Sequence, residues 1–279
     1  MFFALDSSVA APNRAVFFKQ YLPMLKAGIF IDSENLSYNG GRSMRYDVVR
    51  KLVEAQGATV LRANVYVAYD PQREEQDAAY RLGKESHRNA IRRSGFHLVL
   101  KEARRYRNDE GQEIVKANAD IDLAVDALLQ AENLDYILLG TGDGDFLRLV
   151  RALQGRGRRV DLLSFANVNG QIRREADFHF SGFLVPDLVQ AREGRRNGVI
   201  HHVDESRGFA FMTVREGLHV ADVRTDVFLH ISDLHADGGH PVTMAQLVNY
   251  KVRETLIEFT LAPEQDGRVK AVDACEFRW

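Results

Sequence analysis

Short apolar runs alternate with amphipathic segments along the first two thirds of the chain. Such runs, bounded by Gly, Asp or Pro, are typical of strands buried on both faces of a sheet, and apolar positions three and four residues apart predict helices between them. The expected strands are residues 27–31, 59–69, 96–100, 136–139 and, as the last one, 160–165. The expected helices are residues 46–56, 74–94, 120–130 and 146–153, and the charged stretch 101–118 is expected to be an exposed hairpin or loop.

Strands that alternate with helices predict an α/β fold, in which helices cover both faces of a mostly parallel sheet. In such sheets the functional residues lie beyond the carboxyl ends of the strands. The pattern changes after Pro186, where a polar stretch is followed by short strand-like runs that predict a small β-barrel. The expected division is residues 1–25 as an N-terminal extension, 26–190 as the α/β domain, 191–197 as a linker and 198–279 as the barrel.

Composition narrows the function only slightly. Lys and Arg number 37 and Asp and Glu number 39, so the net charge of −2 indicates no particular partner, although it leaves room for a basic face. The single cysteine, Cys275, excludes an intrachain disulfide and a cysteine-ligated zinc site and suits the reducing cytoplasm. No run approaches the roughly 18 apolar residues of a membrane span, so no membrane partner is expected.

Four aspartates stand where a parallel sheet would bring them together. Asp32 and Asp143 follow expected strands, Asp120 opens the helix that leads to the strand before Asp143, and Asp145 lies two residues further on. An Asp at any one of these positions is commonly a helix cap. Four of them close together would repel one another unless a cation shared their charge, and hard divalent cations such as Mg²⁺ prefer oxygen ligands.

The glycine-rich stretch 140–145 favours the same chemistry. It is acidic and lacks the Lys and the Ser or Thr of a phosphate-binding loop, so it would repel a phosphate unless a metal intervened. A divalent ion can orient a water, lower its pKa and offset the charge of a phosphate. The pattern therefore favours metal-assisted hydrolysis of a phosphodiester over nucleotide binding.

Four motifs, in order along the chain, resemble the NYN branch of the PIN-like ribonucleases. They are GIFIDSEN at 28–35, ADIDLAVD at 119–126, LGTGDGDF at 139–146 and GRRV at 157–160. The resemblance implies a PIN-like three-layer α/β/α sandwich and an endoribonuclease pocket that depends on Mg²⁺ or Mn²⁺. The catalytic residues that it carries over are Asp32, Asn35, Asp120, Asp143 and Asp145, of which the four aspartates would be the metal ligands. The chain departs from the family at KANA, residues 116–119, where a glycine often stands next to the acid.

The expected barrel carries aromatic residues at alternate positions of two strands. Alternation places Phe209 with Phe211 on one face of the first strand, and Phe228 with His230 on one face of the second. Such side chains either fill a core or stack on unpaired bases. Segments 198–209 and 226–234 resemble a cold-shock domain, an OB-fold that binds single strands. The resemblance implies that bases stack on Phe209, Phe211, Phe228, His230 and on His202, which stands where the family usually has Trp, and that Arg207 contacts phosphate.

The leading hypothesis is a metal-dependent endoribonuclease whose barrel captures single-stranded RNA, with single-stranded DNA as a further candidate. The arginines at 104, 105, 107, 156, 158 and 159 are candidates for lining the path between the two parts. The alternative is a non-catalytic RNA-binding regulator that retains an acidic metal site. A phosphatase ranks third, because Asp32-Ser-Glu34 lacks the second Asp of an aspartyl-nucleophile motif. The sequence leaves the oligomeric state open, a homodimer included.

Overall fold

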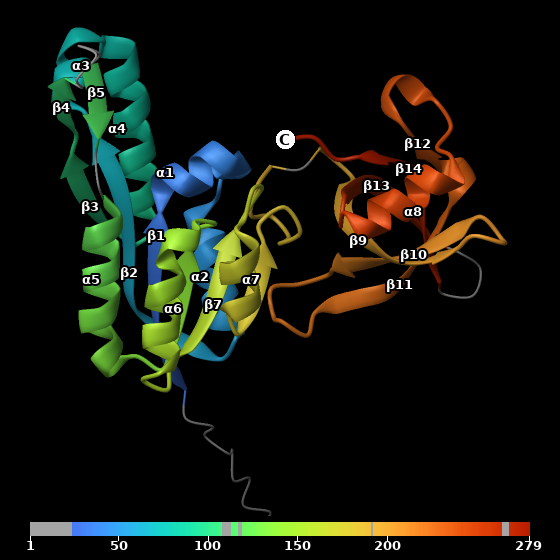
Figure 1. Ribbon diagram of the computed structural model, residues 1–279, viewed down its shortest axis with the longest axis horizontal. Helices are drawn as coiled ribbons and strands as arrows, with labels where there is room; N and C mark the ends of the chain where they lie inside the picture. Colours follow the sequence, from blue (N-terminus) through green and yellow to red (C-terminus); the bar gives the residue numbers. More distant parts are fainter. Residues whose placement is uncertain (1–23, 108–112, 117–118, 191, 264–267) are drawn as a thin grey trace, which may run out of the picture.

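In the part of the chain that the computed structural model describes, six parallel strands form one sheet in the order β3-β2-β1-β6-β7-β8 (Figure 1). The structure describes residues 24–107, 113–116, 119–190, 192–263 and 268–279, so most of the expected N-terminal extension lies outside the described residues. The strands are β1 (Leu25–Asp32), β2 (Ala58–Tyr69), β3 (His97–Glu102), β6 (Tyr136–Gly140), β7 (Arg159–Ser164) and β8 (Phe178–Ser181).

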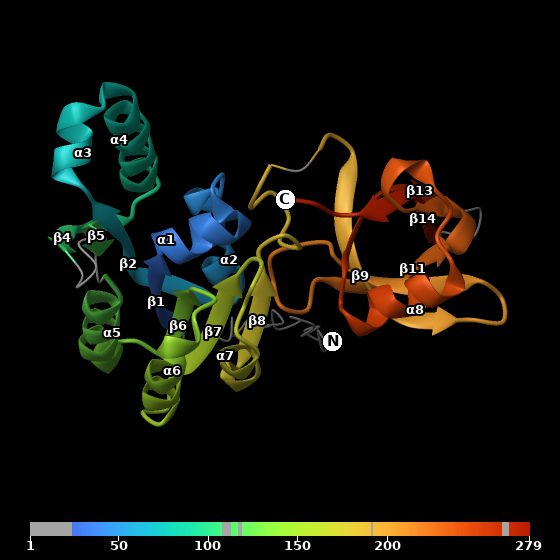
Figure 2. The same ribbon diagram turned by 45° about the horizontal axis from the view of Figure 1, so that its top comes forward.

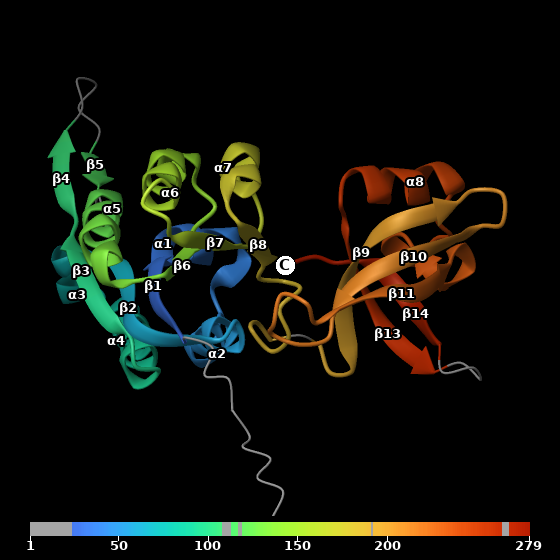
Figure 3. The ribbon, with the colours of Figure 1, turned by 90° about the horizontal axis from the view of Figure 1, so that it is seen from below.

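Helices cover both faces of this sheet, which confirms the predicted α/β/α sandwich (Figure 3). One face carries α2 (Tyr46–Ala55) and α4 (Ala78–Arg93), and the other carries α5 (Ala119–Gln130), α6 (Leu147–Gln154) and α7 (Gly170–Glu175). Side chains alternate along β1, so Ile29 and Ile31 join the core under α2, whereas Phe30 joins the core under α5 and α6. Within the described ranges, no helix has the length and apolar character needed to cross a membrane.

The sequence pattern missed one break and two late elements in this domain. The single helix expected over residues 74–94 is divided into α3 (Pro71–Gln76) and α4, because the Asp77 side chain accepts the Tyr80 N–H at 2.9 Å and starts a new helix. The strand expected to be the last, β7, is followed by α7 and by the edge strand β8. These have only 6 and 4 residues and so carry little periodic signal. The hairpin expected over 101–118 is confirmed by β4 (Arg104–Arg107) and β5 (Glu113–Lys116), which pair antiparallel.

The described residues after position 191 form a five-stranded OB-like barrel, as the sequence predicts. Strands β11, β10, β9, β13 and β14 pair in that order, and a parallel β11–β14 pairing closes the ring. A helix that the pattern missed, α8 (Met244–Val252), begins with a capping box between Thr243 and Gln246. The strands are β9 (Arg195–Asp204), which begins inside the expected linker, β10 (Phe209–Arg215), β11 (Val223–His230), the short β12 (Leu234–His235), β13 (Leu256–Pro263) and β14 (Val269–Glu276).

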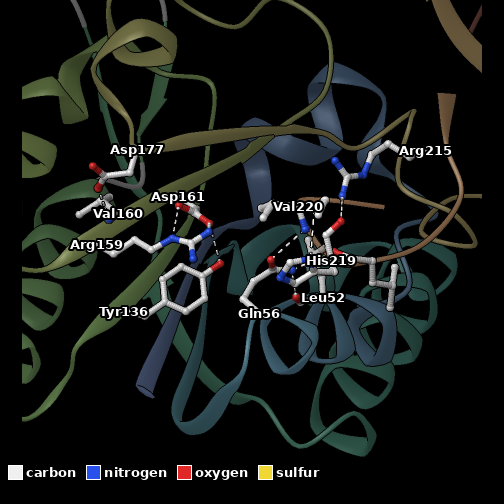
Figure 4. A network of polar contacts seen from close by, with 12 residues as sticks. Leu52, Gln56, Tyr136, Arg159, Val160, Asp161, Asp177, Arg215, His219 and Val220 are labelled. Atoms are coloured by element: carbon white, nitrogen blue, oxygen red, sulfur yellow. Dashed lines mark hydrogen bonds and ion pairs between the residues drawn. The ribbon is translucent and has the colours of Figure 1, made fainter. Parts of the chain in front are cut away.

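The docking loop, residues 216–222 between β10 and β11, attaches the barrel to the α/β domain. Gln56, which is buried at the end of α2, donates from Nε2 to the Leu218 carbonyl at 2.8 Å and accepts the Val220 N–H at 3.0 Å (Figure 4). Leu218 and Val220 also pack against the core under α2. A side chain of one domain therefore forms hydrogen bonds with backbone groups of the other.

Arg215, at the end of β10, strengthens this attachment. Its guanidinium lies 5.1 Å from the ring centre of Phe180 and 5.8 Å from that of Phe178, both in β8, and it donates to the His219 carbonyl. Burial lowers the pKa of Arg215 below its ordinary value, and a cation–π contact at a desolvated site is worth about 2 kcal/mol. The edge strand β8 is thus covered from the side of the barrel (Figure 2).

The Gln56→Ala variant should loosen the contact between the domains. It leaves the partly buried Leu218 carbonyl and Val220 N–H without this partner, at a cost of about 1 kcal/mol for each lost hydrogen bond. We expect faster hydrogen exchange at the Val220 amide and a larger radius of gyration in solution scattering. Gln154→Ala is the matched control, because it removes a hydrogen bond to Glu175 inside the α/β domain and should change neither quantity. Unchanged exchange at Val220 in Gln56→Ala would contradict the docking role.

Candidate active site and aromatic face

The acidic cluster, defined as Asp32, Asp120, Asp143 and Asp145, is built around the meeting point of two central strands. β1 and β6 are adjacent and parallel, so their carboxyl ends lie at the same edge of the sheet. Asp32 ends β1, and Asp143 follows β6 by three residues. The chain proceeds to β2 and β3 on one side of β1 and to β7 and β8 beyond β6. A parallel sheet usually binds its ligand at such a reversal of strand order.

Asp32 is the most buried member of the cluster, with only 8% of its surface exposed. Its Oδ1 accepts the Asn35 N–H at 3.0 Å, which caps α1 (Ser33–Leu36), and its Oδ2 accepts from the Thr141 hydroxyl at 3.4 Å. Burial raises the pKa of Asp32 to about 6; the Asn35 hydrogen bond opposes the rise, and the Asp120 and Asp143 carboxylates add to it. Asp32 is therefore a helix cap and a destabilised carboxylate at the same time.

Asn35 fixes the two strand ends relative to each other. Its side-chain oxygen accepts the Gly142 N–H at 2.8 Å, while its own N–H donates to Asp32. The Asn39 side chain in turn donates to the Asn35 carbonyl at 2.8 Å. Asn35 therefore acts in this structure as a positioning residue, because it holds the loop after β6 against the end of β1.

Asp143 and Asp145 lie on the glycine-rich loop after β6. The Asp143 N–H donates to the Thr141 hydroxyl at 3.2 Å, and its Oδ1 accepts the Asp145 N–H at 2.9 Å, which begins the 3-10 turn η3 (Gly144–Phe146). A Cβ added to Gly144 would lie 2.6 Å from the Asn169 side chain, so the loop packs too closely for a larger residue. This packing holds Asp143 half-buried and leaves Asp145 exposed.

Asp120 joins the cluster from the first turn of α5. Burial, followed by the Asp143 and Asp145 carboxylates, raises its pKa above the ordinary value. Other acids of α5 have partners: Asp122 pairs with Lys101 at 2.8 Å, and Asp126 accepts from the Tyr66 hydroxyl at 2.8 Å. Sequence reasoning did not single out Tyr66, because a Tyr inside a strand has the signature of an ordinary core residue.

The donor set suits a hard divalent cation, although no ready-made site is present. Among the described residues, no three His, Cys, Asp or Glu side chains lie close enough together to hold a metal ion. Burial and the carboxylates of Asp120 and Asp143 nevertheless raise the pKa of Asp32, and burial and the carboxylates of Asp143 and Asp145 raise that of Asp120. Within the described residues no Lys or Arg forms an ion pair with the acidic cluster. Mg²⁺ commonly uses one or two carboxylates and keeps several waters, so the residues present fit such an ion.

The arginines expected to line a path to this site make contacts elsewhere in the structure. Arg156 and Arg158 donate to the carbonyls of Leu128 and Glu132, and Arg159 pairs with the fully buried Asp161 at 2.6 Å (Figure 4). They precede or open β7 and so lie toward the amino ends of the strands, away from the acidic cluster. That prediction was wrong for these three residues. Arg105 pairs with Asp70 at 2.6 Å, and the side chains of Arg104 and Arg107 lie outside those described.

The aromatic face, defined as His202, Phe209, Phe211, Phe228 and His230, lies on three adjacent barrel strands. Phe211 pairs with His202 of β9 on one side and with Phe228 of β11 on the other, and Phe209 pairs with His230. The Phe209 ring centre is 5.4 Å from that of Phe228 and 5.6 Å from that of Phe211. The strands thus gather the residues that the sequence analysis singled out on one surface.

The opposite side of these strands supplies the core of the barrel. Ala210, Met212, Val227 and Leu229 are fully buried, whereas the phenylalanines of the aromatic face stay half-buried and His202 is exposed. Arg207 lies beside this face in the turn between β9 and β10, with 76% of its side chain exposed and its Nε 3.9 Å from Asp204. A half-exposed group of rings beside an exposed guanidinium can contact a base and a phosphate.

The Asp32→Asn variant should stabilise the protein at neutral pH. The folded-state pKa of about 6 exceeds the ordinary value of 3.8, so the contribution of Asp32 to stability is fully present below about pH 4 and is lost as the pH rises through about 6. That difference corresponds to about 3 kcal/mol at pH 7. Asn keeps an acceptor for the Asn35 N–H, so we expect a gain of about 1–3 kcal/mol in denaturant unfolding at pH 7 with a chelator present, shrinking toward pH 4.

Asp47→Asn is the control of opposite sign. Desolvation of Asp47 is outweighed by its bond to Arg45, which lowers the pKa of Asp47, so its removal should reduce stability slightly at pH 7. An Asp32→Asn variant that is less stable than the parent protein at pH 7 would contradict the strain assigned to Asp32.

Part of the chain is similar to known proteins. Residues 26–183 match the family model for the NYN domain. Over 154 residues the chain is 25% identical to the low amplitude and bright protein LabA of Synechococcus elongatus, which covers 54% of this chain and 77% of that protein. A crystal structure of a Vibrio parahaemolyticus protein of unknown function aligns with a TM-score of 0.47 and 24% identity, covering 60% of this chain and 97% of that one.

The family match contains the whole acidic cluster and ends before the barrel. NYN domains are typically nucleases, so the match supports a nuclease-type role connected with RNA. It covers more than half of the 279 residues, and the chain therefore belongs to the NYN domain family.

Proposed function

We propose that the protein is a divalent-metal-dependent endoribonuclease that cleaves single-stranded RNA. The observation that carries this proposal is the burial of Asp32 at the meeting point of β1 and β6, where that burial and the nearby Asp120 and Asp143 carboxylates raise its pKa. Among the described residues, these carboxylates have no cationic partner, so their proximity lowers the stability of the fold. Such destabilising arrangements are typical of catalytic sites. Its membership of the NYN family selects phosphodiester hydrolysis from the reactions that such a site could serve.

In this proposal Asp32, Asp120 and Asp143 hold Mg²⁺ or Mn²⁺, directly or through water, and Asp145 is a further ligand or orients the attacking water. The ion, when bound, lowers the pKa of water and offsets charge on the phosphate. Asn35 keeps the ends of β1 and β6 in register through its bonds to Asp32 and Gly142. A water oxygen attacks phosphorus, the bond from phosphorus to the 3′ oxygen breaks, the exposed Asp145 accepts a proton from the water, and the 3′ oxygen leaves as a hydroxyl after taking up a proton from solvent.

The barrel would capture the strand in the manner of a cold-shock domain. OB-folds bind oligonucleotides through their second and third strands and through the loops beside them. The aromatic face lies mainly on β10 and β11, the second and third strands of this barrel, and Arg207 lies in the first of those loops. Stacking of a base on an aromatic side chain is worth about 1–3 kcal/mol and tolerates any sequence.

A specific observation favours the second candidate, a non-catalytic RNA-binding regulator. No three potential ligands among the described residues lie within reach of one ion. In this alternative the acidic cluster remains as a scaffold, and the aromatic face provides the activity. The two proposals share RNA as partner and differ in whether any metal supports cleavage.

The cytoplasm is the compartment that we propose. Cys275 is a free thiol, which suits a reducing environment. RNA available for single-strand capture is also present there.

The Asp143→Asn variant should lose RNA cleavage. It removes one negative charge from the cluster while an amide oxygen can still accept the Asp145 N–H, so the fold should survive. We expect a rate at least about 100-fold below the parent rate on end-labelled single-stranded RNA with Mn²⁺, the order of loss seen when one charge-stabilising group is removed from an active site. Asp122→Asn is the matched control, because Asp122 pairs with Lys101 and lies outside the cluster. Equal rates in both variants would reject the pocket, and no cleavage by the parent protein with any divalent metal would favour the regulator.

The Phe228→Ala variant should weaken RNA binding without affecting the acidic cluster. Loss of one stacking ring corresponds to roughly 5- to 150-fold in Kd. The measurement is fluorescence anisotropy of a labelled single strand in the presence of a chelator, so that cleavage does not interfere. Val223→Ala removes an exposed side chain from the same strand, β11, and should bind like the parent protein. An unchanged Kd for Phe228→Ala would show that the aromatic face is not the capture surface.

A further inference from the structure

A groove of about 1050 Å³ is lined by residues of both domains. It is lined by residues of α1, of the π-helical turn η1 (Ser37–Gly41), of α4 and of the C-terminal segment, residues 277–279. Ser33 and Glu34 belong to this lining and directly follow Asp32 in the chain. The C-terminus lies beside this part of the α/β domain in all three ribbon views (Figures 1, 2 and 3).

The C-terminal segment forms a fixed wall of this groove. The ring centre of Phe183 in the α/β domain is 5.1 Å from that of Phe277 and 6.3 Å from that of Trp279. Gly40 has a φ of 108°, and a Cβ there would lie 2.5 Å from Phe183 and 3.1 Å from Trp279, so only glycine allows this approach. The last residues of the barrel domain are therefore packed onto the α/β domain.

Three aromatic side chains of the lining remain at least partly exposed to solvent. Tyr38 is 83% exposed and Trp279 is 61% exposed, while Tyr80 is half-buried. Exposed rings that gather in one place mark an interaction surface, whereas rings scattered singly do not. Rings of this kind beside cations are typical of proteins that stack unpaired bases and follow a phosphate backbone.

The charge of the groove is positive, in contrast to the acidic cluster. Lys84 Nζ lies 3.6 Å from Glu34 Oε1, beyond a good hydrogen bond, so its ammonium can still contact a phosphate. Burial lowers the pKa of His87, which is therefore neutral near pH 7. Among the described lining residues, four side chains are cationic and two are acidic, an excess of two positive charges: Arg42, Lys84, Arg192 and Arg278 against Glu34 and Glu258.

We propose that this groove binds single-stranded RNA and leads it to Asp32, an inference that rests on the proposed nuclease function of the acidic cluster. The volume of the groove lies at the upper end of the roughly 300–1,000 Å³ that is typical of a pocket for one drug-sized molecule. Its positive charge selects an anion over an apolar ligand. Rings contributed by three separate segments, at residues 38, 80 and 279, suit successive bases of a strand better than a single mononucleotide.

The experiment measures binding by the full chain with a chelator present, so that it does not depend on catalysis. The probe is a labelled RNA of about 12 nucleotides, within the site sizes of single-strand binders. We expect Trp279→Ala and Tyr80→Ala each to raise the Kd on the order of tenfold, and Lys84→Gln to flatten the dependence of log Kd on log salt by about 0.7. A 4-thiouridine version of the probe should crosslink to peptides that contain Tyr38 or Trp279.

Two matched controls make the outcome decisive. Leu129→Ala removes a side chain that is 64% exposed on α5, and Arg62→Gln removes an exposed charge from β2; neither should change the Kd or the salt slope.

Groove variants that bind like these controls, with no crosslink to the groove, would overturn the inference even if RNA is cleaved. Weakened binding and groove crosslinks in a protein that cleaves nothing would uphold the groove and reject the nuclease proposal alone. A DNA strand and a mononucleotide serve as further arms, and equal competition by the mononucleotide would contradict a strand-binding groove.

Discussion

The parallel pairing of β1 with β6 is the constraint on which the rest of the site depends. Both strands are buried on both faces, so the first polar side chains beyond them must gather where the core ends. Asp32 is held there by the N–H of Asn35 and the hydroxyl of Thr141, although burial makes its negative charge unfavourable. The Asn35 side chain accepts the Gly142 N–H and so holds the loop after β6 against the end of β1. The positions of Asp143 and Asp145 are thereby fixed relative to Asp32.

The sheet and its helices could be read from the sequence because each depends on local pattern. An apolar run such as β1 has no stable alternative to burial, and its alternating contacts with two cores follow from strand geometry. The four aspartates could be found because their positions relative to the strands fix where they lie. The break between α3 and α4 was missed because an Asp inside a polar helix looks like any exposed residue until its cap geometry is seen. By contrast, the capping box at Thr243 and Gln246 was a readable signal for α8.

Contacts between distant segments were beyond sequence reasoning. Arg159 has the sequence context of a surface arginine, yet it pairs with Asp161 inside the sheet, where the Tyr136 hydroxyl completes the group (Figure 4). Arg159 and Asp161 are neighbours on β7, but the register between β7 and β6, which places Tyr136 opposite Arg159, brings the third member of the group from a distant segment. The same is true of Gln56, because no neighbouring residue in the chain indicates that its side-chain amide will hydrogen-bond to the barrel loop through both its nitrogen and its oxygen.

Gln56, Arg215 and Gly40 together have a consequence for how this protein could arise and change. Each is shaped by atoms of the other domain: a loop backbone, a pair of edge-strand rings and a terminal indole. The two halves are therefore not freely interchangeable cassettes. Replacing one domain by an unrelated one would leave the Gln56 amide without its backbone partners, the Arg215 guanidinium without its two rings, and a gap beside Gly40 where Trp279 packs. The two domains should therefore have evolved together.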